Sequence, residues 1–256
     1  MIPDMQKFLK KAIPVAAWIL IWQLVSMIIH NQILLAGPVD TVKAMVNLMG
    51  TADFRASVGA TTIRILSGLL IGTVLGLVLA FGAYSREILE LFLQPLVLCL
   101  KSVPVASFVI LLLIWFGSGN ISVIICAMVV FPIIYLNCLE GLKNTDRNLL
   151  EMGKVFRMPV GRQLRYIFVP QLLPFFRSGL KLATGMSFKS GIAAEVIGQP
   201  LHTIGNGLYQ AKIYLETGEL FAWTIVVVVL SYICEKVICL LIDLFSHGNK
   251  GKEAAQ

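Results

Sequence analysis

The sequence has too little charge for a soluble protein. Only 14% of its 256 residues are Asp, Glu, Lys or Arg, whereas soluble domains carry about a quarter. Hydrophobic residues make up 57% of the chain and gather in long runs, and about 20 apolar residues are enough to cross the hydrocarbon core of a bilayer. The composition therefore excludes a soluble globular protein and predicts an integral membrane protein.

The alternating ten-residue segments that are typical of an outer-membrane β-barrel are also missing. Backbone amides in lipid have no water to bond, so spanning segments without that alternation must satisfy their own hydrogen bonds as helices. We therefore expect an all-α integral membrane protein. There is no internal repeat and no low-complexity segment, and residues 1–256 are interpreted as a single transmembrane domain.

Several catalytic and metal-binding signatures are absent as well. The sequence contains neither the G-x-x-x-x-G-K-[ST] phosphate-binding loop nor the H-E-x-x-H zinc motif, and its three histidines form no cluster. Its five cysteines lie in apolar stretches without C-x-x-C spacing, which favours buried packing side chains over a metal or redox site. We expect no ATPase site, no bound cofactor or metal, and no nucleic-acid partner.

What the chain does have is six apolar runs long enough to cross the membrane. The first follows three lysines, as in a secretory signal, but no small-x-small cleavage site comes after it, which favours an uncleaved span. The third contains Pro95 and the segment Lys101-Ser-Val-Pro104, and we expect it to bend because each proline removes a helical hydrogen bond. The expected spans are residues 13–29, 61–83, 88–116, 121–139, 172–197 and 221–245.

Small residues recur at every fourth position of the second run. Such a stripe lets the backbone of another helix approach closely, either within the subunit or in a second copy. The four residues are Gly68, Gly72, Gly76 and Ala80.

Lysine and arginine predict the orientation, because cytoplasmic segments of membrane proteins are enriched in both. With the N-terminus inside, the external segments hold only Lys43, Arg55 and Lys212, while the other segments between the spans are rich in basic residues. We therefore expect both termini, and the loop between the fourth and fifth spans, in the cytoplasm.

That loop, residues 143–170, has the pattern of two amphipathic helices separated by a break at Met158-Pro159. The polar face of the first holds Arg147, Glu151 and Lys154, and its apolar face holds Leu149, Met152 and Phe156. The second carries Arg162 and Arg165 outward and Leu164, Ile167 and Phe168 inward. Two surface helices inside a loop are typical of a docking element. The alternative is an interfacial pair whose basic residues bind anionic lipid headgroups.

At this loop the chain resembles the permease subunits of bacterial ABC importers, in the branch associated with nitrate, sulfonate, taurine, bicarbonate and pyrimidine-type thiamine precursors. The family pattern is E-A-A, three residues, G, nine residues, I-x-L-P. It corresponds here to Glu151-Met152-Gly153, then Arg157, then Ile167-Phe168-Val169-Pro170. Arg157 departs from the turn glycine of the family. If the backbone is left-handed there, a residue other than glycine costs on the order of 1–2 kcal/mol.

The resemblance implies a division of labour. Two permease copies, a pair of cytoplasmic ATPase subunits and an external solute-binding protein would form the importer, and ATP would bind only to the ATPase. A stand-alone secondary transporter or channel is the alternative, but the inverted repeats or paired broken helices that would favour it are not visible. The residues to which the resemblance gives ATPase coupling are Leu150, Glu151, Met152, Gly153, Phe156, Arg157, Ile167 and Pro170.

Charged residues within the expected spans are candidates for the translocation path. A charge at the bilayer centre costs roughly 2.5–3.5 kcal/mol, so it normally faces a cavity or a partner. The third and fifth spans line the path in the importers that the chain resembles, which points to Lys101, Lys189 and Glu195. The two lysines would attract an anionic solute. The alternatives are ion pairs of Lys189 with Glu195 or of Lys101 with Glu140, placement of the lysines at the membrane interface, and a hydrogen-bonded structural role for Glu195.

Overall fold

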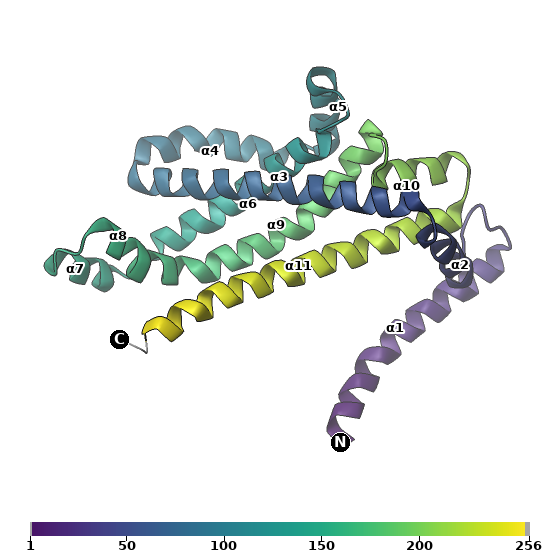
Figure 1. The fold of residues 1–256 in the computed structure, drawn as a ribbon, viewed down its shortest axis with the longest axis horizontal. Coiled ribbons are helices and arrows are strands. Elements are labelled where there is room, and N and C mark those ends of the chain that lie inside the picture. Colours follow the sequence, from purple (N-terminus) through teal and green to yellow (C-terminus); the bar gives the residue numbers. More distant parts are fainter. Residues whose placement is uncertain (1, 254–256) are drawn as a thin grey trace.

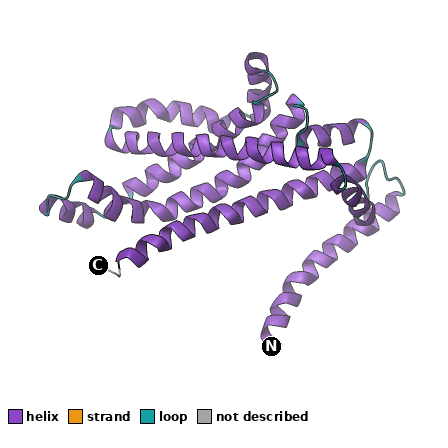
Figure 2. Ribbon diagram, in the orientation of Figure 1, coloured by secondary structure: helices purple, strands orange, loops and turns teal. Residues whose placement is uncertain are grey.

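The computed structural model describes residues 2–253, and side chains within residues 13–243; this part of the chain forms helices and no strand. The expected all-α fold is confirmed, and Figure 2 shows only short loops between the helices. In chain order the elements are α1 (Ile2–Ile29), α2 (Pro38–Met49), α3 (Ala52–Ser85), α4 (Glu87–Ser102), α5 (Val105–Phe116), α6 (Ile121–Lys143), α7 (Arg147–Val155), α8 (Val160–Gln163), η1 (Leu164–Phe168), α9 (Val169–Gly198), α10 (Ile204–Ile213) and α11 (Thr217–Glu253).

The long helices α3, α6, α9 and α11 run side by side along the molecule, with α6 between α3 and α9 (Figure 1). The glycine stripe of α3 faces α6 of the same chain. A Cβ atom added to Gly68 would lie 2.5 Å from the carbonyl oxygen of Val123, and one added to Gly72 would lie 2.8 Å from that of Ala127. Only a residue without a side chain fits at these two contacts.

The third expected span is broken into two helices. The axes of α4 and α5 differ in direction by 103° across the break at Val103-Pro104. Pro104 is the N-cap of α5, where its missing amide hydrogen removes no bond from the helix. The expected bend is therefore present at Pro104, whereas Pro95 lies inside α4, which continues through it without interruption.

Three helices among the described residues are long and apolar enough to cross a membrane alone: α3, α6 and residues 217–243 of α11. The bent pair of α4 and α5 provides a fourth if it is one span. The apolar part of α1 is shorter, and α9 carries several charged residues along its 30 residues. That α1 and α9 also cross the membrane, which would give six spans, therefore stays a prediction.

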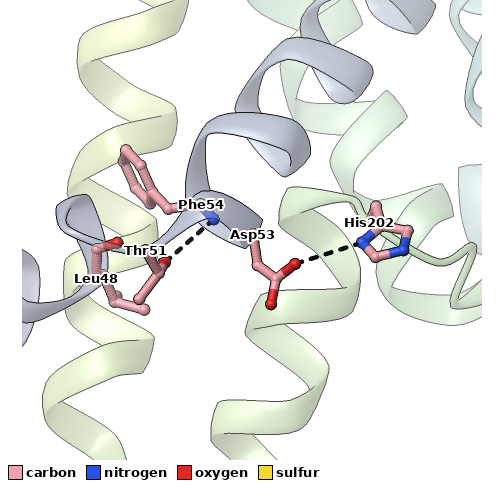
Figure 3. A network of polar contacts seen from close by, with 5 residues as sticks. All are labelled: Leu48, Thr51, Asp53, Phe54 and His202. Carbon is pink, nitrogen blue, oxygen red and sulfur yellow. Dashed lines mark hydrogen bonds and ion pairs between the residues drawn. The ribbon is translucent and has the colours of Figure 1, made fainter.

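The bundle has two distinct ends. At one, the loop end, lie residues 143–170 and the C-terminal part of α11, while α2 and α10 lie at the opposite end (Figure 1). There the Thr51 hydroxyl caps α3 by accepting a 3.2 Å hydrogen bond from the Phe54 amide. The neighbouring Asp53 carboxylate lies 3.8 Å from the His202 ring (Figure 3), so the start of α3 lies near the segment before α10.

Candidate functional site

The first helix of the 143–170 loop begins at a side-chain cap. The Asp146 carboxylate accepts a 2.9 Å hydrogen bond from the Asn148 amide, one of the amides left without a partner at the start of α7. The Asp146 amide itself donates to the Gln171 side chain at 3.3 Å. Because Gln171 belongs to α9, this contact holds the start of the loop against the fifth expected span.

The same helix ends in a left-handed residue. Arg157 has a φ angle of +48°. Its amide donates to the carbonyl of Lys154 at 3.0 Å, and the Met158 amide donates to that of Gly153 at 2.9 Å. This pair of hydrogen bonds is a Schellman motif, in which glycine usually takes the left-handed position. The left-handed backbone that the family glycine suggested is present, and Arg157 carries its conformational cost.

Gly153 brings the two halves of the loop together. It is buried in α7, and a Cβ atom there would lie 3.1 Å from the Cδ1 atom of Ile167, whose side chain is also buried. The Gln163 amide group adds a 2.9 Å hydrogen bond to the carbonyl of Met158. Gly153 and Ile167, the small residue and the isoleucine of the motif, thus pack against each other. The two halves of the loop fold back on each other as a hairpin.

The second half of the loop is not a separate helix, which corrects the sequence expectation. α8, η1 and α9 follow one another without a break from Val160 to Gly198. In η1 the Val169 amide donates to the carbonyl of Leu164, five residues earlier. Pro170 then follows, without an amide hydrogen to donate. A proline ring in a regular α-helix clashes with the carbonyl four residues before it, and the wider π-helical turn gives it room.

The tip of this hairpin is apolar and open. Val155, Phe156 and Val160 expose 77%, 73% and 72% of their surface. Phe156, which the sequence pattern placed on the apolar face of the helix, points away from the protein because it lies at the C-cap rather than within α7. Glu151 is exposed too and makes no ion pair with any described residue. Leu150 is half-buried, and Met152 is exposed.

Glu195 is buried where α9 meets α3 and α10. Its side chain is 0% exposed, and its Oε2 atom accepts hydrogen bonds from the Thr61 hydroxyl at 2.8 Å and the Gly205 amide at 3.3 Å. The Thr61 hydroxyl oxygen also accepts from the Ile204 amide at 2.9 Å. The geometry favours the structural alternative, because the carboxylate joins α3 and α9 to the first turn of α10.

Lys101 and Lys189 are both exposed, on α4 and α9. Neither forms an ion pair among the described residues, so the two alternative pairs with Glu140 and Glu195 are wrong for this structure. Lys189 lies on the face of α9 that neither α3 nor α6 covers, four residues before exposed Ala193. The structure does not bring these two lysines and Glu195 together into one cluster.

Sequence reasoning passed over several charged residues inside the expected spans, among them Arg64 and Lys236. Arg64 of α3 lies near Glu195, and its Nη1 atom is buried and donates no hydrogen bond to any described residue. Lys236 of α11 lines a polar cavity at the loop end. Both interrupt long apolar runs, which is the signal that singled out Lys101 and Lys189 and could have found them.

Comparisons with known proteins agree with this architecture. The sequence pattern of a family described as "Binding-protein-dependent transport system inner membrane component" matches residues 72–247. A putative aliphatic sulfonates transport permease of Bacillus subtilis (strain 168) is 25% identical, over 88% of this chain and 82% of its own length. A formylaminopyrimidine transport permease of Halalkalibacterium halodurans is 29% identical, over 70% of this chain and 71% of its own length.

A solved structure has the same fold. This structure, described as "Crystal structure of an amino acid ABC transporter with histidines", matches with a TM-score of 0.56 and 17% sequence identity. The alignment covers 76% of this chain and 92% of that one.

Proposed function

Given that the chain belongs to the family of binding-protein-dependent transport system inner membrane components, we propose that it is the permease subunit of an ATP-driven importer. As a member of this family it is a multi-pass protein of the inner membrane and a transport component rather than an enzyme. In the proposed complex a separate cytoplasmic ATPase pair supplies the energy, a second permease copy completes the pore, and an external binding protein delivers the solute.

The observation that carries this proposal is the hairpin at the loop end. Its exposed side chains Val155, Phe156 and Val160 form an apolar tip that nothing in the described chain covers. Exposed apolar groups that lie together mark interaction surfaces, and here basic residues and Glu151 surround them. Because α8 continues through η1 into α9, a force applied to the hairpin would be transmitted directly to α9, the fifth expected span.

The competing interpretation of the hairpin is a lipid-binding element. Basic amphipathic helices place their apolar side chains in the membrane interface and their cations at the headgroups. A left-handed turn, a buried glycine contact and a π-helical turn would serve no purpose in such an element. These three features fix the shape of the hairpin, and a fixed shape is what a protein groove recognises.

The proposed orientation can be tested by cysteine labelling. In a variant without the five native cysteines, Phe156→Cys should react in intact cells only with a membrane-permeant maleimide. Tyr214→Cys, just after α10 at the opposite end, should also react with an impermeant one. Both side chains are at least 70% exposed, so neither result depends on burial. Labelling of Phe156→Cys by the impermeant reagent would place the hairpin outside the cell and exclude coupling to a cytoplasmic ATPase.

We further propose that the transported solute is an anion and that Lys189 lies on its path. The named solute of one relative is a sulfonate, which is anionic at neutral pH. Lys189 is an exposed cation without an ion-pair partner among the described residues, on a helix continuous with the hairpin. A lysine held in a membrane helix requires a water-filled cavity or an anionic partner nearby.

Lys189→Gln tests this role. Loss of one positive charge on the path should raise the KM for uptake of an anionic solute about fivefold, the equivalent of roughly 1 kcal/mol of binding. Lys43→Gln removes an exposed lysine from α2 at the opposite end and should leave the KM unchanged. Uptake kinetics in cells measure both, with the amount of permease checked by immunoblot. Equal KM values for Lys189→Gln and the wild type would remove Lys189 from the path.

A further inference from the structure

A polar cavity of about 330 Å³ lies between α9 and α11 at the loop end, separate from the hairpin. Its volume is in the range of small-ligand pockets. Three of its lining residues are basic and one is acidic. The lining consists of Pro174, Arg177, Ser178, Lys181, Glu235, Lys236 and Cys239.

Two ion pairs frame this cavity. The Arg177 Nη2 atom lies 2.8 Å from Oδ2 of Asp243, and the Lys181 Nζ atom lies 3.5 Å from Oε1 of Glu235. Both pairs join α9 to α11, so each carboxylate is engaged by a cation of the facing helix. The third cation, Lys236, has no carboxylate partner among the described residues and lies over the Tyr232 ring at 5.4 Å. Counted over the described residues, the framed cavity therefore retains one net positive charge.

The basic groups also have hydrogen-bond donors that the two ion pairs do not use. A guanidinium has five N–H donors, and one contact of Arg177 with Asp243 leaves others for a ligand. The 3.5 Å separation of Lys181 from Glu235 is long for a charged hydrogen bond, and the Lys181 side chain is 63% exposed. Ser178 adds a hydroxyl at the same wall. The cavity thus presents a guanidinium, two ammonium groups and a hydroxyl from two helices.

The depth of these groups restricts the ligand. Arg177 and Lys181 lie about 12 and 18 Å from the first residue of α9, at 1.5 Å per residue. In the expected topology, with α9 as the fifth span, they therefore lie beyond the surface loop and within the membrane, where an unpaired charge is costly. Long side chains can reach back to the headgroup layer from there. Basic pockets between transmembrane helices on the cytoplasmic side bind the headgroups of anionic lipids.

From this geometry we propose that the cavity between α9 and α11 binds a singly charged tetrahedral oxyanion, supplied by a phospholipid headgroup or by free phosphate. The bound anion bridges Arg177 and Ser178 on α9 to Lys236 on α11, and so adds a third link between helices that two ion pairs already join. This inference goes beyond the proposed transport function, since anion binding here needs neither the ATPase nor the hairpin.

Lipid binding to purified permease tests the proposal. Native mass spectrometry of delipidated protein with dioleoyl-phosphatidylglycerol should show an affinity about fivefold lower for Lys236→Gln than for the wild type, which is the contribution of one basic residue near an anionic membrane surface. Lys212→Gln is the matched control, because its ammonium group lies 5.8 Å over the Tyr209 ring in the same way but at the opposite end. This control should bind as the wild type does.

Two further arms identify the source of the anion. Dioleoyl-phosphatidylcholine has the same acyl chains but no net charge, and it should bind equally weakly to all three proteins. If excess inorganic phosphate displaces phosphatidylglycerol from the wild type, the site accepts a free oxyanion. If it does not, the site is specific for a lipid headgroup. Equal phosphatidylglycerol affinity of Lys236→Gln and Lys212→Gln overturns the proposal, and so does an equal preference for the two lipids.

Discussion

Replacing Glu151 by lysine should abolish ATP-driven uptake while leaving the permease folded in the membrane. The Glu151 side chain is exposed on α7 and pairs with no other described residue, so the fold does not depend on it. In the proposed complex its carboxylate faces basic groups of the ATPase groove. A lysine there places like charges opposite each other, which costs several kcal/mol at an interface and weakens association at least a hundredfold. Solute uptake by cells, together with ATP hydrolysis by the reconstituted complex, measures the effect.

Glu87→Lys is the matched control for this reversal. Glu87 is another exposed glutamate at the loop end, in the first turn of α4 and outside the hairpin. Reversing its charge costs at most about 1 kcal/mol of stability through the helix dipole. Uptake should therefore persist. Normal uptake by Glu151→Lys would show that the hairpin does not couple the permease to an ATPase. A Glu151→Lys protein that is missing from the membrane would show instead that Glu151 is needed for folding.

The hairpin shows what a sequence motif can and cannot predict. The break at Met158-Pro159 and the special turn at Arg157 follow from local chemistry, because proline and a family glycine both report on backbone angles. The continuity of α8 with α9 was not predicted. It depends on the π-helical turn before Pro170, and apolar periodicity calculated for a regular helix does not describe such a turn.

Glu195 shows a second limit of prediction from sequence. Its position in an apolar run marks it as unusual, but pore-lining and structural roles give the same sequence pattern. The deciding contact is with Thr61, 134 residues earlier in the chain. This contact forms because α10 folds back and brings the amides of its first turn to the end of α9. Two donors on Oε2 help the interior to tolerate the Glu195 carboxylate, whereas Lys189 is exposed and forms no ion pair with a described residue.

The glycine stripe was visible in the sequence, and its partner was not, since the pattern suits a helix of the same chain as well as one of a second copy. The contact with α6 in this chain makes Gly68→Ala a disruptive substitution despite its small size. The new methyl carbon would lie 2.5 Å from the Val123 carbonyl oxygen and 2.6 Å from the Cβ atom of Cys126. Neither is the flexible end of a side chain, so α3 and α6 must move apart, which typically costs about 1–3 kcal/mol.

The matched control lies on the same helix. A Cβ atom added to Gly59 of α3 meets nothing within 4 Å, so Gly59→Ala adds a methyl group without a clash. It should be neutral or stabilising by up to about 1 kcal/mol, because alanine favours a helix over glycine. Thermal unfolding of the purified proteins should show a Tm lower by on the order of 5 °C for Gly68→Ala, and unchanged or higher for Gly59→Ala. Equal Tm values for the two variants would mean that α3 and α6 do not meet at Gly68. The stripe would then be free to contact a second copy of the chain.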